Sequence, residues 1–135
     1  DRLRAAYLKA GVVAQVLEFL ESMGDAWGAA DLALSRGGAS SIAEIAANAV
    51  PAVVAPYPWH ADQHQAANAR DLITVGGVVL VEDAVEPEGN LESIGPTLEK
   101  LLGDIGQRTA MRRALEARPR QDAAVEISRR LLAVS

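Results

Sequence analysis

Short apolar runs that alternate with helical segments constrain the fold of this chain more than any other feature of its sequence. Four such runs lie at 12–17, 32–35, 52–55 and 78–81. Each is rich in valine, leucine or alanine and has the length of a short buried strand. Strands separated by helices are typical of βαβ units, whose crossovers are right-handed. We therefore predict an α/β fold, a Rossmann-like parallel sheet with helices on both faces.

The helical segments follow from the spacing of apolar residues at three and four positions. One helix is expected before the first strand, at about 2–9, and three are expected between the strands, at about 22–30, 41–48 and 62–75. Three more helices are expected after the last strand, at about 91–102, 104–117 and 122–134. The stretch 82–90 is acidic and rich in turn-forming residues, so we expect it on the surface.

Composition excludes several classes of function. The chain has 135 residues, enough for one domain. It has no cysteine, which removes disulfides, thiolate zinc sites and cysteine nucleophiles. Its formal net charge of −5 argues against a nucleic-acid partner. The chain begins at Asp1 without a methionine, which predicts a processed or truncated start.

The first candidate site is the stretch 35–41, Ser-Arg-Gly-Gly-Ala-Ser-Ser, between a predicted strand and a predicted helix. Glycines allow a close approach of the backbone, and N–H groups at a helix start bind anions. Arg36, Ser40 and Ser41 could add further donors. The pattern predicts a phosphate or pyrophosphate site, and the alternative is a tight turn capped by serine.

Glu44 has two readings at this point. The stretch 41–44 fits a capping box, in which the carboxylate folds back onto the helix start. The functional reading is that Glu44 accepts hydrogen bonds from two ribose hydroxyls. The spacing alone does not choose between them.

The second candidate site is the stretch 57–68, which combines aromatic, histidine and amide side chains. Gln65 and Asn68 are three residues apart and share a helix face, with His64 beside them. Amides donate and accept hydrogen bonds, which suits the hydroxyls of a sugar. Both candidate sites follow predicted strands, and ligands of parallel sheets bind at the carboxyl ends of the strands.

Other chemistry at these positions is less well supported by the spacing. His60, Asp62 and His64 could bind a metal, but no HExxH pattern or cysteine accompanies them. A solvated helix turn is a further alternative for this stretch. The serines of the first site could belong to a catalytic triad, although the G-x-S-x-G motif is absent.

Together these motifs resemble the MurG family of UDP-N-acetylglucosamine transferases. The resemblance rests on 30–32, 35–44, Pro51, Pro56 and 64–69, and the H-Q-x-x-N-A element narrows it most. It implies an inverting glycosyltransferase of the two-domain GT-B type. The whole of 1–135 would then be the incomplete C-terminal half, which binds the donor and ends in helices.

The resemblance also implies roles for individual residues. The uracil would be met by Phe19 and Leu20. The diphosphate would be met by Arg36, Gly38, Ala39, Ser40 and Ser41. Glu44 would hold the ribose. The N-acetylglucosamine would be met by His64, Gln65 and Asn68. The substrate is UDP-N-acetylglucosamine, with no metal, no tightly bound cofactor and no catalytic residue in this chain.

The implied reaction transfers N-acetylglucosamine to a lipid-linked N-acetylmuramoyl-pentapeptide in peptidoglycan synthesis. The acceptor, the catalytic base and peripheral membrane contact would belong to an N-terminal domain absent from this chain. The enzyme would be cytoplasmic, at the inner face of a bacterial plasma membrane, and this chain alone would be inactive. Two alternatives remain: another GT-B glycosyltransferase or sugar-nucleotide epimerase, and a non-catalytic subunit that binds a nucleotide sugar.

Overall fold

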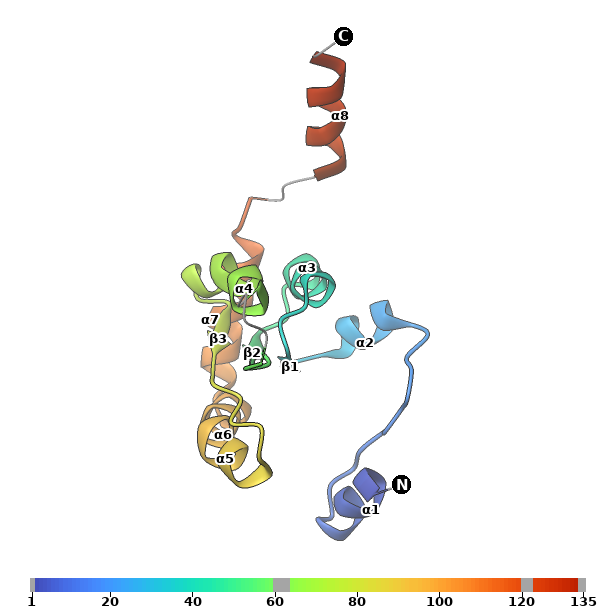
Figure 1. Cartoon of the computed structure of the whole chain (residues 1–135), viewed down its shortest axis with the longest axis vertical. Helices are drawn as coiled ribbons and strands as arrows, with labels where there is room; N and C mark the ends of the chain where they lie inside the picture. The colour runs from blue at the N-terminus through green and yellow to red at the C-terminus, as the bar shows by residue number, and fades with distance from the viewer. Residues whose placement is uncertain (1, 60–63, 120–122, 134–135) are drawn as a thin grey trace.

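The centre of the molecule is a three-stranded parallel sheet in the order β1-β2-β3 (Figure 1). A computed structural model describes residues 2–59, 64–119 and 123–133. The strands are β1 (Ala33–Ser35), β2 (Ala52–Val54) and β3 (Val78–Leu80). They confirm three of the predicted strands and the predicted α/β class.

One face of the sheet is covered by α3 (Ala39–Asn48) and α4 (His64–Thr74) (Figure 1). Ile45 of α3 and Leu72 of α4 are almost completely buried against alternate residues of β2. A short helix, α2 (Met23–Ala29), packs against α3. Burial of these aliphatic side chains is the main force that holds the two helices on the sheet.

The opposite face is covered by α6 (Gly95–Gly103) and α7 (Ile105–Glu116). Val53, which points away from α3 and α4, packs with Leu101 and Met111 of these helices. The sheet therefore has helices on both faces, as predicted, because β2 is buried on both sides.

Two terminal helices lie away from the sheet (Figure 1). These are α1 (Arg2–Lys9) and α8 (Ala123–Ala133). Their apolar side chains are largely exposed, for example Leu8 and Leu132. Over the described residues, no helix combines the length and the hydropathy that a membrane span requires.

The predicted strand at 12–17 is wrong. A strand needs a neighbour to satisfy its backbone, whereas the described pairing joins β1 only to β2, and β3 only to β2. In this segment Val13 is fully exposed, and the carbonyl of Val16 accepts a hydrogen bond of 2.8 Å from Arg4. High β propensity is not sufficient without a partner.

Helix boundaries after the sheet also differ from the prediction. The helix expected at 91–102 is two helices, α5 (Pro87–Ser93) and α6, because Pro96 lacks an N–H and occupies the first turn of a new helix. Pro87 likewise begins α5 inside the stretch expected to be surface turns.

Candidate functional site

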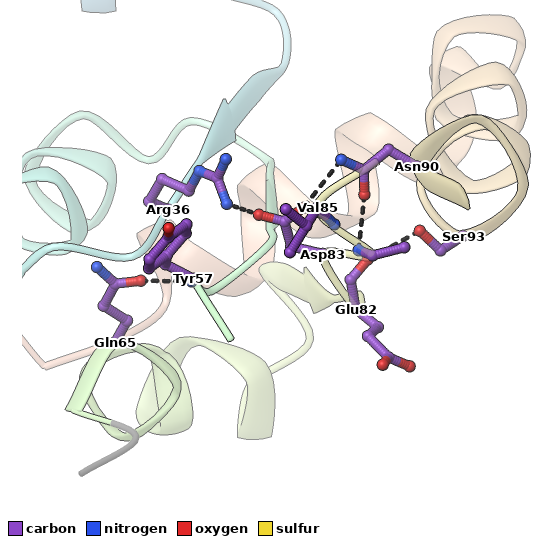
Figure 2. A network of polar contacts seen from close by, with 9 residues as sticks. Arg36, Tyr57, Gln65, Glu82, Asp83, Val85, Asn90 and Ser93 are labelled. Carbon is purple, nitrogen blue, oxygen red and sulfur yellow. Dashed lines mark hydrogen bonds and ion pairs between the residues drawn. The ribbon is translucent and has the colours of Figure 1, made fainter. Parts of the chain in front are cut away.

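The carboxyl ends of the three strands meet at one edge, and each strand is followed by a residue of one polar cluster. Arg36 follows β1, Tyr57 follows β2 and Asp83 follows β3. The guanidinium carbon of Arg36 lies 5.4 Å from the centre of the Tyr57 ring, a cation–π distance. Arg36 also forms an ion pair with Asp83 (Figure 2).

Asp83 is the buried centre of this cluster, since its side chain is only 1% exposed. Its Oδ1 accepts hydrogen bonds of 2.9 Å from the Val85 N–H and from the Asn90 amide (Figure 2). Its Oδ2 is the oxygen that forms the ion pair with Arg36. The expectation that 82–90 lies wholly on the surface is therefore wrong at Asp83. Its one local signal is its position just after the apolar run 78–81, while the partner that it meets, Arg36, is distant in the sequence.

The glycine turn packs tightly against the start of α4. Gly37 has a φ of +83°, and a Cβ built there would lie 2.8 Å from the carbonyl oxygen of Gln65. The Asn68 amide donates a hydrogen bond of 3.1 Å to the Gly37 carbonyl. The two candidate sites thus lie together at the same sheet edge, as the sequence predicted.

The first turn of α3 presents backbone donors at this edge. Gly38 is the N-cap, and the first bond within the helix runs from the Ile42 N–H to the Gly38 carbonyl. The N–H groups of Ala39, Ser40 and Ser41 precede that bond, so they have no acceptor within the helix. They therefore form an anion-binding arrangement.

The amides at the start of α4 are already oriented. The Gln65 Oε1 accepts a hydrogen bond of 2.7 Å from the Tyr57 N–H (Figure 2). The Asn68 amide nitrogen is held by the Gly37 carbonyl. Each amide thus has one end fixed, with Gln65 turned to donate and Asn68 turned to accept. His64 begins α4 and is exposed.

The other two candidate metal ligands, His60 and Asp62, lie outside the described residues. Within the described ranges, no group of three or more His, Cys, Asp or Glu side chains is placed to hold a metal ion.

Glu44 does not form the capping box. The helix begins at Ala39, two residues before the expected start, so Ser41 is not the N-cap. The Glu44 carboxylate instead accepts a hydrogen bond of 2.9 Å from the Trp27 indole of α2. Sequence spacing could not find this pair, because its members are 17 residues apart on different helices.

The two residues expected at the uracil stand apart from this edge. Phe19 is 79% exposed, and Leu20 is half-buried. Both belong to the segment between α1 and α2, which runs away from the sheet (Figure 1). No hydrogen bond found among the described residues joins either of them to α3.

Two hollows flank the polar cluster, and Asp83 lines both. One, of about 480 Å³, lies between Leu34, Asn90 and Leu98. The other, of about 450 Å³, lies between Tyr57, Gln65 and Leu80. The sheet edge is therefore concave on both sides of the Arg36–Asp83 pair.

Comparison with known proteins assigns the chain. Residues 2–127 match the family described as "Glycosyltransferase family 28 C-terminal domain". Two curated relatives are named UDP-N-acetylglucosamine–N-acetylmuramyl-(pentapeptide) pyrophosphoryl-undecaprenol N-acetylglucosamine transferase. The one from Chlorobaculum parvum is 40% identical over 87% of this chain and 31% of its own length. The one from Halorhodospira halophila is 39% identical over 91% of this chain and 34% of its own length.

A solved structure agrees with these matches. The crystal structure of Acinetobacter baumannii MurG superposes with a TM-score of 0.70 and 29% identity, covering 86% of this chain and 33% of that protein. The chain thus spans about a third of the length of the relatives that it matches. Because the family match covers residues 2–127 of 135, the chain belongs to the glycosyltransferase family 28 C-terminal domain family.

Proposed function

We propose that this chain binds the nucleotide-sugar donor, UDP-N-acetylglucosamine, for an inverting transfer to a lipid-linked N-acetylmuramoyl-pentapeptide. The observation that carries the proposal is the hydrogen bond between Asn68 and Gly37, which joins a helix-start anion site to a pair of oriented amides. The names of the curated relatives support the same donor and acceptor.

The diphosphate is proposed to lie at the start of α3. The N–H groups of Ala39, Ser40 and Ser41 and the positive end of the helix dipole would hold its oxygens. Gly38 leaves room for this approach, because a Cβ built there meets no atom within 4 Å. Arg36, which the resemblance also assigns to the diphosphate, stands beside this loop with its guanidinium turned to Asp83.

The remaining donor groups are assigned in the same way. Glu44 is proposed to hold the ribose hydroxyls, with its carboxylate oriented by Trp27. Gln65 and Asn68 are proposed to meet the N-acetylglucosamine, with His64 beside them. Phe19 and Leu20 are proposed for the uracil, which requires the segment before α2 to fold over the sheet edge.

In the proposed reaction, the bond from C1 of N-acetylglucosamine to the diphosphate breaks, and UDP leaves with the electron pair. A new bond forms from C1 to the C4 hydroxyl oxygen of N-acetylmuramic acid, and a general base takes the hydroxyl proton. The donors at α3 stabilise the charge on the leaving diphosphate. The base, the acceptor site and the contact with the inner face of the membrane are proposed to lie in the part of the relatives that this chain does not match.

Calorimetric titration of this chain with UDP-N-acetylglucosamine, UDP-galactose and UDP-glucose tests the proposal. We expect the first to bind most tightly, and equal affinity for all three would contradict the assignment of Gln65 and Asn68. No measurable transfer is expected from this chain alone.

A variant pair separates the ribose role of Glu44 from a structural one. Glu44→Ala should weaken binding of UDP about tenfold, roughly one charge-assisted hydrogen bond, and leave binding of 2′,3′-dideoxy-UDP unchanged. Trp27→Phe is the matched control, since it removes the indole donor and keeps the carboxylate. If Glu44→Ala weakens the binding of UDP and of 2′,3′-dideoxy-UDP equally, the role of Glu44 is purely structural.

A further inference from the structure

Asp83 carries a buried charge and is not among the residues proposed to bind the donor. Its side chain is 1% exposed, and its Oδ1 is occupied by Val85 and Asn90. A carboxylate at this depth is costly unless it is paired. Arg36 provides the opposite charge, on the side of Oδ2.

Arg36 connects Asp83 to the glycine turn. It follows β1 directly, and Gly37 and Gly38 come next. The Tyr57 ring supports the guanidinium at 5.4 Å, while Asp83 holds it from the end of β3 (Figure 2). The side chain of Arg36 therefore bridges β1 and the loop after β3, across the end of β2.

The backbone of residues 36–38 is consequently fixed from two sides. Arg36 is held through Asp83, and the carbonyl of Gly37 is held through Asn68. Donors that stabilise an anion act only when they are already aimed at it, so small displacements of such a loop reduce binding.

We propose that Asp83 is a positioning residue for the glycine turn: by pairing with Arg36, it fixes the backbone that leads to the N–H groups of α3. This inference rests on the proposed function, because it concerns how the diphosphate is bound. Asp83 acts through Arg36 and does not itself contact the donor. Since the pair carries no net charge, the attraction for the diphosphate comes from the helix start.

The test compares UDP with uridine, which lacks the diphosphate, in titrations of this chain. Asp83→Asn should weaken UDP binding about tenfold, as expected when a supporting contact of a preorganised site is lost. Uridine binding should stay within about twofold of the wild type. Equal weakening of both ligands, or unchanged UDP binding, overturns the inference.

Glu82→Gln is the matched control. It removes the same charge from the adjacent residue, but Glu82 is exposed and uses its backbone carbonyl, not its carboxylate, to accept a hydrogen bond from Ser93. UDP affinity should remain within about twofold of the wild type. A tenfold loss in this variant would show that the net charge of the region, and not the Arg36–Asp83 pair, sets the affinity.

Two variants at the half-exposed Arg36 keep the inference testable even if Asp83→Asn does not fold. Arg36→Gln should lose about tenfold in UDP affinity, and Arg36→Lys, which keeps a cation for Asp83, should recover most of it. The double variant Arg36→Gln/Asp83→Asn should bind UDP no more weakly than either single variant, because both act through one contact. The inference is overturned if Arg36→Lys binds UDP no more tightly than Arg36→Gln. It is also overturned if the losses of UDP affinity in the two single variants add up in the double variant.

Wild-type titrations separate this inference from the proposed function. If the wild type binds neither UDP nor UDP-N-acetylglucosamine, the proposed function is wrong, and the inference fails with it. If the wild type binds UDP and Asp83→Asn binds it equally well, only the inference is wrong.

Discussion

Gly37→Ala tests the contact between the glycine turn and α4, on which the candidate site depends. The substitution has two costs. A φ of +83° is left-handed, and it costs about 1–2 kcal/mol for a residue with a Cβ. The new Cβ would also lie 2.8 Å from the Gln65 carbonyl and 2.9 Å from a methyl group of Val54, and such overpacking costs about 1–3 kcal/mol. The expected loss of unfolding free energy is therefore about 2–5 kcal/mol.

Urea unfolding followed by circular dichroism at 25 °C measures this loss, provided that the m-value is unchanged. A loss of this size is a large part of the roughly 5–15 kcal/mol that stabilises a typical domain. Gly76→Ala is the matched control, because Gly76 has a φ of +81° but no atom within 4 Å of the built Cβ. It should lose only the conformational part, about 1–2 kcal/mol.

The difference between the two variants isolates the close approach. If Gly37→Ala is no more destabilising than Gly76→Ala, then the turn does not lie against the Gln65 carbonyl. The joining of the two candidate sites would then be refuted as well.

Two further predictions concern the packing and the helix ends, with the same unfolding assay. Leu101→Ala should lower the free energy of unfolding by about 2–5 kcal/mol, because Leu101 is 1% exposed between the sheet and α7. Leu102→Ala, at a 65% exposed position, should change it by less than about 0.5 kcal/mol. Similar losses of unfolding free energy in the two variants would contradict the packing of α6. Asp104→Ala should lower the free energy of unfolding by about 1 kcal/mol, because the Asp104 carboxylate caps α7 by accepting a hydrogen bond of 2.8 Å from the Gln107 N–H. An unchanged midpoint of urea unfolding would show that this cap does not form.

The helices and strands could be predicted where the pattern of apolar residues follows their burial. β2 is buried on both sides, and its run of alanine and valine was recognisable for that reason. The run at 12–17 is also rich in valine but does not form a strand, because pairing depends on a neighbour that local sequence does not specify. Pro96 divides the helix expected at 91–102, since apolar spacing alone does not register a missing N–H donor.

The candidate site was predictable where it followed from topology. The glycine turn and the amides of α4 were expected at one edge because parallel strands end there together, and the Asn68–Gly37 bond confirms that placement. Asp83 was missed because its partner, Arg36, is 47 positions away in the chain, and the acidity of its neighbours suggested a solvated turn. Long-range pairs of this kind are set by the fold and leave little local signal.

The role of Glu44 shows how the sequence and the structure combine. If Glu44 had folded back onto the helix start, its negative charge would compete there with a diphosphate. The structure instead holds it against Trp27, while the first turn of α3 contains no acidic residue and its N-cap, Gly38, has no side chain to cap the helix. The N–H groups at this end are thus not matched by an anion of the helix itself. That arrangement favours an external anion at α3 and supports the proposal that a nucleoside diphosphate occupies the position.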